Sequence, residues 1–356
     1  MTTTVLSPRM TTWLKRVPIE DFKFLVRSIL KSLFTIWLVT TLIFFVIRLM
    51  PGNPVDIFVQ DLLLKGLTYE DAQTQAASML GVRLDRPLHE QYIEFLGNLL
   101  QGDLGKSYIS RNVPVAQMIV QRLPWSIFSI GTALLISFTL GILLGMIIAY
   151  KRNSWLDHLL TNLAAAMDAL PSYLIAILLI LLLSTVFKIV PVTMTRGAVS
   201  PGIQPGFTLE FFVDVLKHYA LLAFVYVLSR TGSWILTMKS STMSTLGEDY
   251  VTAARARGLP EGRIITAYVG RNASLPLVTR LALSIGFVVG GSVIIESIFV
   301  YPGIGLLLSQ ALYSRDYPVM QGVFLVTTIA VVLSNFVADL LYGWLDPRIR
   351  IAGEAQ

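Results

Sequence analysis

Cysteine is absent from this 356-residue chain, which excludes disulfide bonds and thiolate metal ligands. Histidine is scarce, and His89, His158 and His218 are too scattered to have the spacing of a metal-binding motif. Charged residues are also few, at 14% of the chain against about 25% in average soluble domains. No zinc-protease pattern and no cysteine nucleophile is available. A Ser/Lys or paired-Asp active site is left open, although nothing favours one.

Apolar residues are abundant instead. They make up 54% of the chain, and the mean hydropathy is +0.68, which predicts an integral membrane protein. Six runs are long enough to cross a bilayer, and they lack the alternation of barrel strands, so we expect transmembrane helices. The predicted fold is therefore all-α with six spans. These spans are residues 32–50, 125–150, 159–187, 219–236, 281–300 and 322–345.

The distribution of Lys and Arg predicts the orientation of these spans. More than half of the 28 basic residues lie in the polar tail 1–31, the turn at Lys151 and Arg152, the segment 239–280 and the tail 346–356. Cytoplasmic segments of membrane proteins carry such an excess, so we expect both termini in the cytoplasm. The first apolar run begins too late for a secretory signal and is interpreted as a retained span. The net charge of +6 is thus assigned to membrane orientation and not to nucleic-acid binding.

Residues 51–124 are predicted to form a small, mostly helical external subdomain. Apolar residues recur at helical spacing in 56–64 and 91–100, and Thr68 precedes an acidic helix start as a possible N-cap. A Gly-Lys-Ser sequence within it is similar to a phosphate-binding loop, but Leu100 stands where that loop requires glycine. We therefore expect a glycine-rich turn after a helix. Its characteristic residues are Gly102, Asp103, Gly105 and Ser107.

The segment 238–280 is a polar, basic island between two spans. Gly258 can adopt the left-handed conformation that ends a helix, and Pro260 suits the first position of the next helix. Glu261 follows as an anion near a positive helix end. The pattern predicts two short helices that meet at a sharp corner, a shape suited to a groove on another protein. An ordinary solvated connection is the alternative.

Several spans contain residues that are unusual in lipid. Asp168 beside Pro171 suggests a kinked helix lining a cavity, whereas Arg230 and Glu296 could instead reach an interface. Small residues at a spacing of about four predict close helix approach in the second and fifth spans. These are Gly141, Gly145, Gly286, Gly290 and Gly291. The candidate substrate pathway consists of Asp168, Ser172, Glu296, Asn335 and Asp339.

The island resembles the ATPase-docking loop of permease subunits of ATP-binding-cassette importers. The similarity runs from Glu248 to Gly258 and continues to Leu275-Pro276, although Thr252 replaces the first glutamate of the family pattern. The long gap before Leu275-Pro276 is similar to the dipeptide, oligopeptide and nickel branch. Further matching stretches are Pro51-Gly52-Asn53-Pro54, Leu80-Gly81, Arg86-Pro87-Leu88, Gly102–Ser107, Glu296 with Phe299, Pro302-Gly303, Asp316-Tyr317-Pro318 and Asp346-Pro347-Arg348.

This resemblance implies an assembly. Two homologous permease subunits form the pore, two ATPases bind the docking loops, and an external binding protein delivers the substrate across the bacterial inner membrane. ATP and Mg²⁺ belong to the ATPases, so no cofactor and no enzymatic activity is expected in this chain. Ala254 is expected to face the ATPase groove. The docking residues implied are Glu248, Asp249, Tyr250, Ala253, Ala254, Arg255, Ala256, Arg257, Gly258, Leu259 and Pro260.

The domain order that follows is a cytoplasmic tail 1–31, a first span 32–50, the external subdomain 51–124, a permease core 125–345 and a tail 346–356. Peptides are the expected substrate, with nickel and oligosaccharides as alternatives within the same branch. A secondary transporter or channel is the alternative from another class. Such proteins usually show internal repeats, and no convincing repeat relates the two halves of this chain.

Overall fold

The computed structural model describes residues 19–51, 54–76, 86–110 and 113–345. Within these residues the elements are helical, and a single isolated bridge joins Lys106 to Pro114. Four helices are long and apolar enough to cross a bilayer. They are α1 (Ile19–Leu49), α6 (Val115–Tyr150), α9 (Leu209–Leu246) and α16 (Tyr317–Leu345). The all-α membrane fold predicted from composition is confirmed.

Two further candidate spans are bent. The helix α7 (Trp155–Ala169) meets α8 (Ser172–Ile180) and its π-helical continuation η2 (Leu181–Val186) at 98°. The chain bends here because the ring of Pro171 disfavours helical backbone at the preceding residue, Leu170, which is extended. The kink predicted at Pro171 is therefore confirmed. The second bent pair joins α11 (Glu261–Arg263), η4 (Ile264–Gly270) and α12 (Arg271–Ala273) to α13 (Leu275–Val289) at 45°.

The predicted fifth span, 281–300, is wrong in its bounds. The helix α13 starts earlier, at Leu275, and ends at Val289, after which α14 (Val293–Ile298) and α15 (Ile304–Ser314) fold back as a short hairpin. Gly291 has φ +69, and a Cβ there would lie 2.5 Å from the backbone nitrogen of Gly305. Glycine at this position permits both the left-handed conformation and the close contact with the start of α15.

Glycines set the closest helix contacts, as their spacing predicts. A Cβ on Gly141 would lie 2.2 Å from the Cβ of Trp234, and one on Gly145 would lie 2.6 Å from that of Met238, so α6 and α9 pack backbone to backbone. Gly286 and Gly290 play the same part between α13 and α16. These contacts hold together the helical bundle, and polar segments lie at its two ends.

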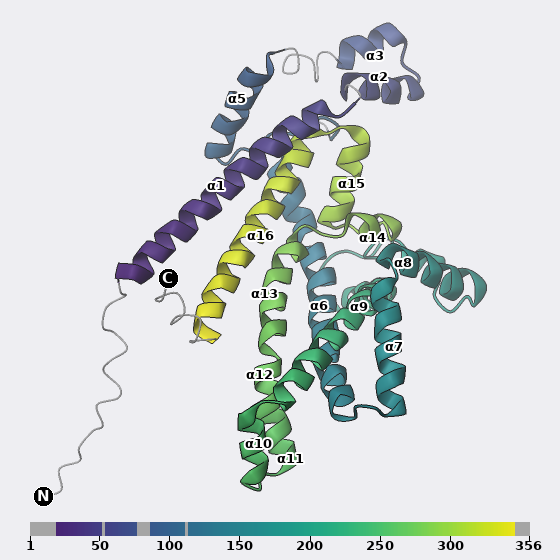
Figure 1. The fold of residues 1–356 in the computed structure, drawn as a ribbon. Coiled ribbons are helices and arrows are strands. Elements are labelled where there is room, and N and C mark those ends of the chain that lie inside the picture. Colours follow the sequence, from purple (N-terminus) through teal and green to yellow (C-terminus); the bar gives the residue numbers. More distant parts are fainter. Residues whose placement is uncertain (1–18, 52–53, 77–85, 111–112, 346–356) are drawn as a thin grey trace, which may run out of the picture.

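Those two ends lie at opposite extremes of the bundle (Figure 1). At one end are α2 (Pro54–Leu64), α3 (Tyr69–Ala76) and α5 (Leu88–Leu100), and at the other is α10 (Asp249–Ala256) with α11.

The cap predicted at Thr68 is present, because its Oγ1 accepts a hydrogen bond from the Asp71 amide at 3.3 Å. The helix α6 begins at Val115, ten residues before the predicted span, and it continues through Pro124. The remaining described element is the 3₁₀ turn η3 (Val192–Thr195).

Candidate functional site

The corner formed by α10, α11 and the residues between them is a helix, a tight turn and a second helix, as predicted. Gly258 has φ +71, and its amide donates to the Arg255 carbonyl at 2.9 Å while the Leu259 amide donates to the Ala254 carbonyl at 3.3 Å. The turn thus satisfies carbonyls at the end of α10 and fixes the direction in which the chain leaves. Pro260 is the N-cap of α11 and not its first residue, one position earlier than predicted.

One face of this corner is a small hydrophobic core of its own. Val251, Ala254, Ile264 and Val269 are buried, and Tyr150 at the end of α6 packs against them. Ala254 is only 3% exposed, so the prediction that it faces a partner groove is wrong. Its small side chain lets α10 approach η4, and its role is to hold the corner in shape.

The other face is open to solvent. Most of the predicted docking residues lie there, and Leu259 is half-buried. Arg255 and Glu261 join the two helices across the turn, with Nη2 and Oε1 3.1 Å apart, and Asn272 donates to the Tyr250 hydroxyl at 2.9 Å. The exposed members are Glu248, Asp249, Tyr250, Ala253, Arg255, Ala256, Arg257, Gly258 and Pro260.

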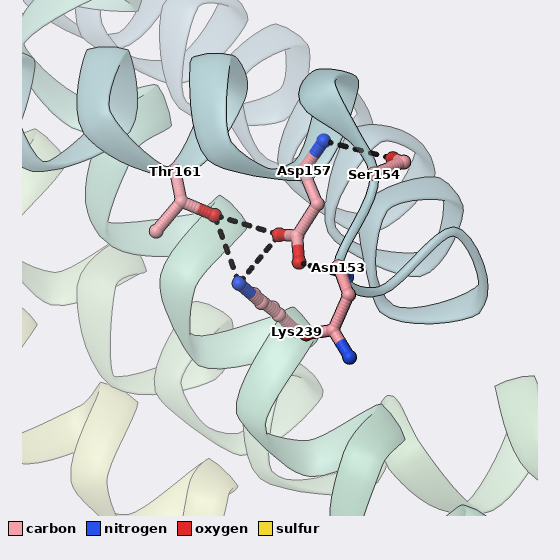
Figure 2. Close-up of polar contacts among 5 residues, drawn as sticks. All are labelled: Asn153, Ser154, Asp157, Thr161 and Lys239. Atoms are coloured by element: carbon pink, nitrogen blue, oxygen red, sulfur yellow. Dashed lines mark hydrogen bonds and ion pairs between the residues drawn. The ribbon is translucent and has the colours of Figure 1, made fainter.

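A polar cluster that sequence reasoning missed supports the helix leading into the corner. Figure 2 shows Lys239 of α9 pointing at Asp157 in the first turn of α7. The Lys239 Nζ lies 2.6 Å from Asp157 Oδ1 and 2.9 Å from Thr161 Oγ1. The Asn153 amide donates to Asp157 Oδ2 at 3.1 Å, and Ser154 caps the helix. The Ser154-to-Asp157 spacing was a visible capping signal, but nothing local pointed to Lys239.

The predicted pathway residues do not form one cluster. Asp168 is exposed and Ser172 half-buried at the bend between α7 and α8, whereas Asn335 and Asp339 are exposed on α16. Glu296 has no exposed surface. Its carboxylate accepts from Ser126 Oγ at 2.9 Å and from the Gly305 and Leu306 amides at 2.8 and 3.2 Å. In this structure Glu296 pins the start of α15 to α6.

The predicted glycine-rich turn fastens the end of the molecule that carries α2, α3 and α5. Gly102 and Gly105 have positive φ, and Asp103 accepts a hydrogen bond from the Gly105 amide at 2.8 Å. Ser107 donates to Asp316 at 2.5 Å, and the Tyr108 amide donates to the same carboxylate at 3.1 Å. The turn therefore ties the segment between α5 and α6 to the junction of α15 and α16.

Together these features define a multi-span helical membrane protein with a rigid, exposed corner at one end. Residues 141–351 match the family described as binding-protein-dependent transport system inner membrane component, and the chain belongs to that family. It is 36% identical over 312 residues to a putative peptide permease protein of Brucella suis, covering 88% of this chain and 94% of the relative.

Two further relatives cover the same shares of both chains. Identity is 36% over 324 residues to a di/tripeptide transport system permease protein of Pseudomonas aeruginosa, and 34% over 328 residues to a dipeptide transport system permease protein of Escherichia coli. The family resemblance carried by the island and the motifs around it is confirmed. The chain is therefore an inner-membrane transport subunit that works with a binding protein and an ATPase, and it is not an enzyme.

Proposed function

We propose that this chain is a pore-forming permease subunit of an ATP-driven importer for di- or oligopeptides. The names of its relatives support a peptide substrate, since they describe dipeptide, di/tripeptide and oligopeptide permeases. The observation that carries the mechanism is the corner itself. It has a buried core on one side and an exposed face on the other, and the turn at Gly258 joins its two helices. A partner that grips such a body can move it as a unit.

In the proposed assembly this chain pairs with a second, homologous permease subunit, and each permease receives one ATPase. The ATPases bind ATP and Mg²⁺, whereas this chain carries no cofactor. Closure of the ATPases moves the corner, which packs on Tyr150 at the end of α6 and follows α9 in the chain. Because α6 and α9 pack backbone to backbone, that movement reaches the bundle and opens it alternately to each side.

The proposed orientation places both termini and the corner in the cytoplasm and the helices α2, α3 and α5 outside. Single cysteines can test it, because the chain has none of its own. Tyr69→Cys should react with an impermeant thiol reagent in intact cells, whereas Trp155→Cys and Gly262→Cys should react only after lysis. Equal labelling of positions 69 and 262 in intact cells would contradict this orientation.

For the substrate pathway, Asp168, Ser172, Asn335 and Asp339 remain the proposed contributors, because each keeps surface that a pore or partner subunit can meet. Glu296 is proposed to act indirectly, through the placement of α15. Substitution of Asn335 by Ala should then alter peptide transport at unchanged complex yield, whereas substitution of Glu296 should reduce the yield.

The function is tested by purifying the complex with its binding protein in nanodiscs. We expect ATPase subunits to co-purify, and ATP hydrolysis to rise when the binding protein carries a di- or oligopeptide. If only nickel or an oligosaccharide stimulates ATP hydrolysis, the chain is still an importer permease but its substrate is not a peptide. Transport without any associated ATPase would show a secondary transporter instead.

A further inference from the structure

The helix α5 lies beside the external end of α1 (Figure 1). The Tyr92 hydroxyl is 2.7 Å from Thr41 Oγ1, and the Phe95 and Phe44 rings are 5.3 Å apart. Thr41 precedes the last residue of α1, Leu49, by eight positions, which at 1.5 Å per residue is about 12 Å along the helix axis. Side chains of α5 therefore reach a segment of α1 that belongs to a membrane span.

The outward face of α5 changes character along its length. Ile93, Leu96 and Leu100 share one helical stripe, and Ile93 and Leu100 are 67% and 89% exposed. The same stripe carries His89 and Glu90 at the other end of the helix, where both are exposed. The outward face is thus polar in the first turn and apolar in the last two.

The inward face explains why α5 keeps this orientation. Gln91 is buried and accepts a hydrogen bond from the Arg48 guanidinium at 2.9 Å. Tyr92 also stacks near Phe45, at 5.6 Å between ring centroids. These contacts hold α5 on α1 by polar and aromatic groups, so the exposed apolar stripe is not available to the interior of the chain.

The helix α1, against which α5 packs, has exposed apolar side chains of its own. Leu42, Val46 and Leu49 are exposed on α1, and residues 26–49 of that helix are long and apolar enough to cross a membrane. Phe45, which Tyr92 contacts, is exposed as well. A helix that lies in a membrane interface has an apolar face toward the acyl chains and a polar face toward water, with aromatic rings at the headgroup level.

We propose that α5 is an interfacial helix that dips obliquely into the outer leaflet, so that Ile93, Leu96 and Leu100 contact lipid while His89 and Glu90 stay in water. The proposal rests on the orientation proposed above, but not on the identity of the transported substrate. Lipid is the occupant because the stripe adjoins the lipid-facing side of α1, beside a segment that a soluble binding protein does not reach. The bilayer then sets the height of the external helices over the pore.

Single cysteines carrying a spin label test this in nanodiscs that hold the complete transporter. Positions 93 and 100 are compared with Val46 as a lipid reference, Tyr69 on α3 as a water reference, and Glu90 as the matched control on the same stripe. Labels at 93 and 100 should be relaxed by oxygen in preference to a water-soluble nickel chelate, as at 46. The label at 90 should behave as at 69.

Preferential relaxation of 93 and 100 by the nickel chelate, as at 69, would overturn the proposal. So would shielding of both positions that appears only when the binding protein is added, because the occupant would then be that protein. Peptide-stimulated ATP hydrolysis, measured on the same labelled complexes, reports separately on the proposed function. A complex that hydrolyses ATP normally while 93 and 100 are in water would sink only the lipid assignment.

Discussion

The carboxylate of Asp157 and the ammonium of Lys239 lie 2.6 Å apart and join the start of α7 to α9 across 82 residues of sequence (Figure 2). Both groups are largely buried, and Thr161 and the Asn153 amide complete their hydrogen bonds. Lys239 lies seven residues before the end of α9, which leads directly into the corner of α10 and α11. The pair therefore fixes the helix that enters the corner.

Removing one member of this pair should destabilise the protein. Lys239→Met leaves the Asp157 carboxylate buried without its counter-ion, at a cost on the order of 3 kcal/mol. The expected result is a lower melting temperature of the purified complex. Asp157→Leu combined with Lys239→Met should recover most of the loss, because no charge is left buried. Equal melting of the single and double variants would show that the pair carries no such coupling.

Gly141→Ala tests the close contact of α6 and α9. The new methyl would lie 2.2 Å from the Trp234 Cβ, so the helices must separate, which costs about 1–3 kcal/mol. Gly131→Ala, on the same helix, is the matched control, because the nearest atom to its new methyl would be Val288 Cγ1 of α13 at 3.7 Å and alanine favours helix by about 0.5–1 kcal/mol. The melting temperature should fall in the first variant and hold or rise in the second. A lower melting temperature for Gly131→Ala than for Gly141→Ala would contradict the close packing of α6 on α9.

The Asp316 carboxylate gives a pH dependence. Burial raises its pKa above the ordinary 3.8, although the Ser107 hydroxyl and the Tyr108 and Ile109 amides favour the charged form. A raised pKa contributes stability that is complete below the ordinary value and is lost as pH rises through the raised one. Asp316→Asn cannot titrate. The wild-type stability relative to that variant should fall as pH increases from about 4.

Amide hydrogen exchange at Tyr108 and Ile109 measures this locally, after correction for the intrinsic effect of pH on exchange. Because both proteins share every other titratable group, their difference isolates Asp316. A stability difference that does not change with pH would mean that the hydrogen bonds balance burial, and one that grows with pH would mean that they outweigh it; either result would contradict the raised pKa.

The long spans and the corner could be predicted because their signals are local. The apolar runs of α6 and α16 are recognisable by their length. The turn at Gly258 is recognisable because it depends on the backbone conformation of that one residue. The pairs Asp157–Lys239 and Ser107–Asp316 could not be predicted, since their members are 82 and 209 residues apart. The hairpin of α14 and α15 was missed because the apolar run continues past Val289 into α14, which hides the break at Gly290 and Gly291.

Ala254 shows a different limit. Its place in the motif was correct, but the motif does not say which side of a short helix packs inward. The apolar residues Val251 and Ile264, which surround it in the structure, decide that face. The proposed docking surface is therefore formed by its exposed neighbours, and Ala254 supports them from within.

Gly258→Val tests whether the corner transmits movement from the ATPase. No atom lies within 4 Å of the position that a Cβ would occupy, so the substitution acts through backbone strain alone. A β-branched residue at φ +71 costs about 1–3 kcal/mol. That is enough to shift an equilibrium on the order of tenfold and too little to prevent membrane insertion of the chain.

Two variants serve as controls for this change. Gly262→Val also adds a side chain in open space on the corner, but at a residue without positive φ. Gly258→Asn keeps a residue that tolerates the left-handed conformation. Both should assemble and couple almost as the wild type does.

The decisive measurement is ATP hydrolysis by the purified complex, with and without peptide-loaded binding protein. We predict that Gly258→Val assembles at near-normal yield but loses most of the peptide-dependent stimulation, while Gly262→Val and Gly258→Asn retain it. Normal stimulation in Gly258→Val would contradict the claim that this corner couples the ATPase to the membrane helices.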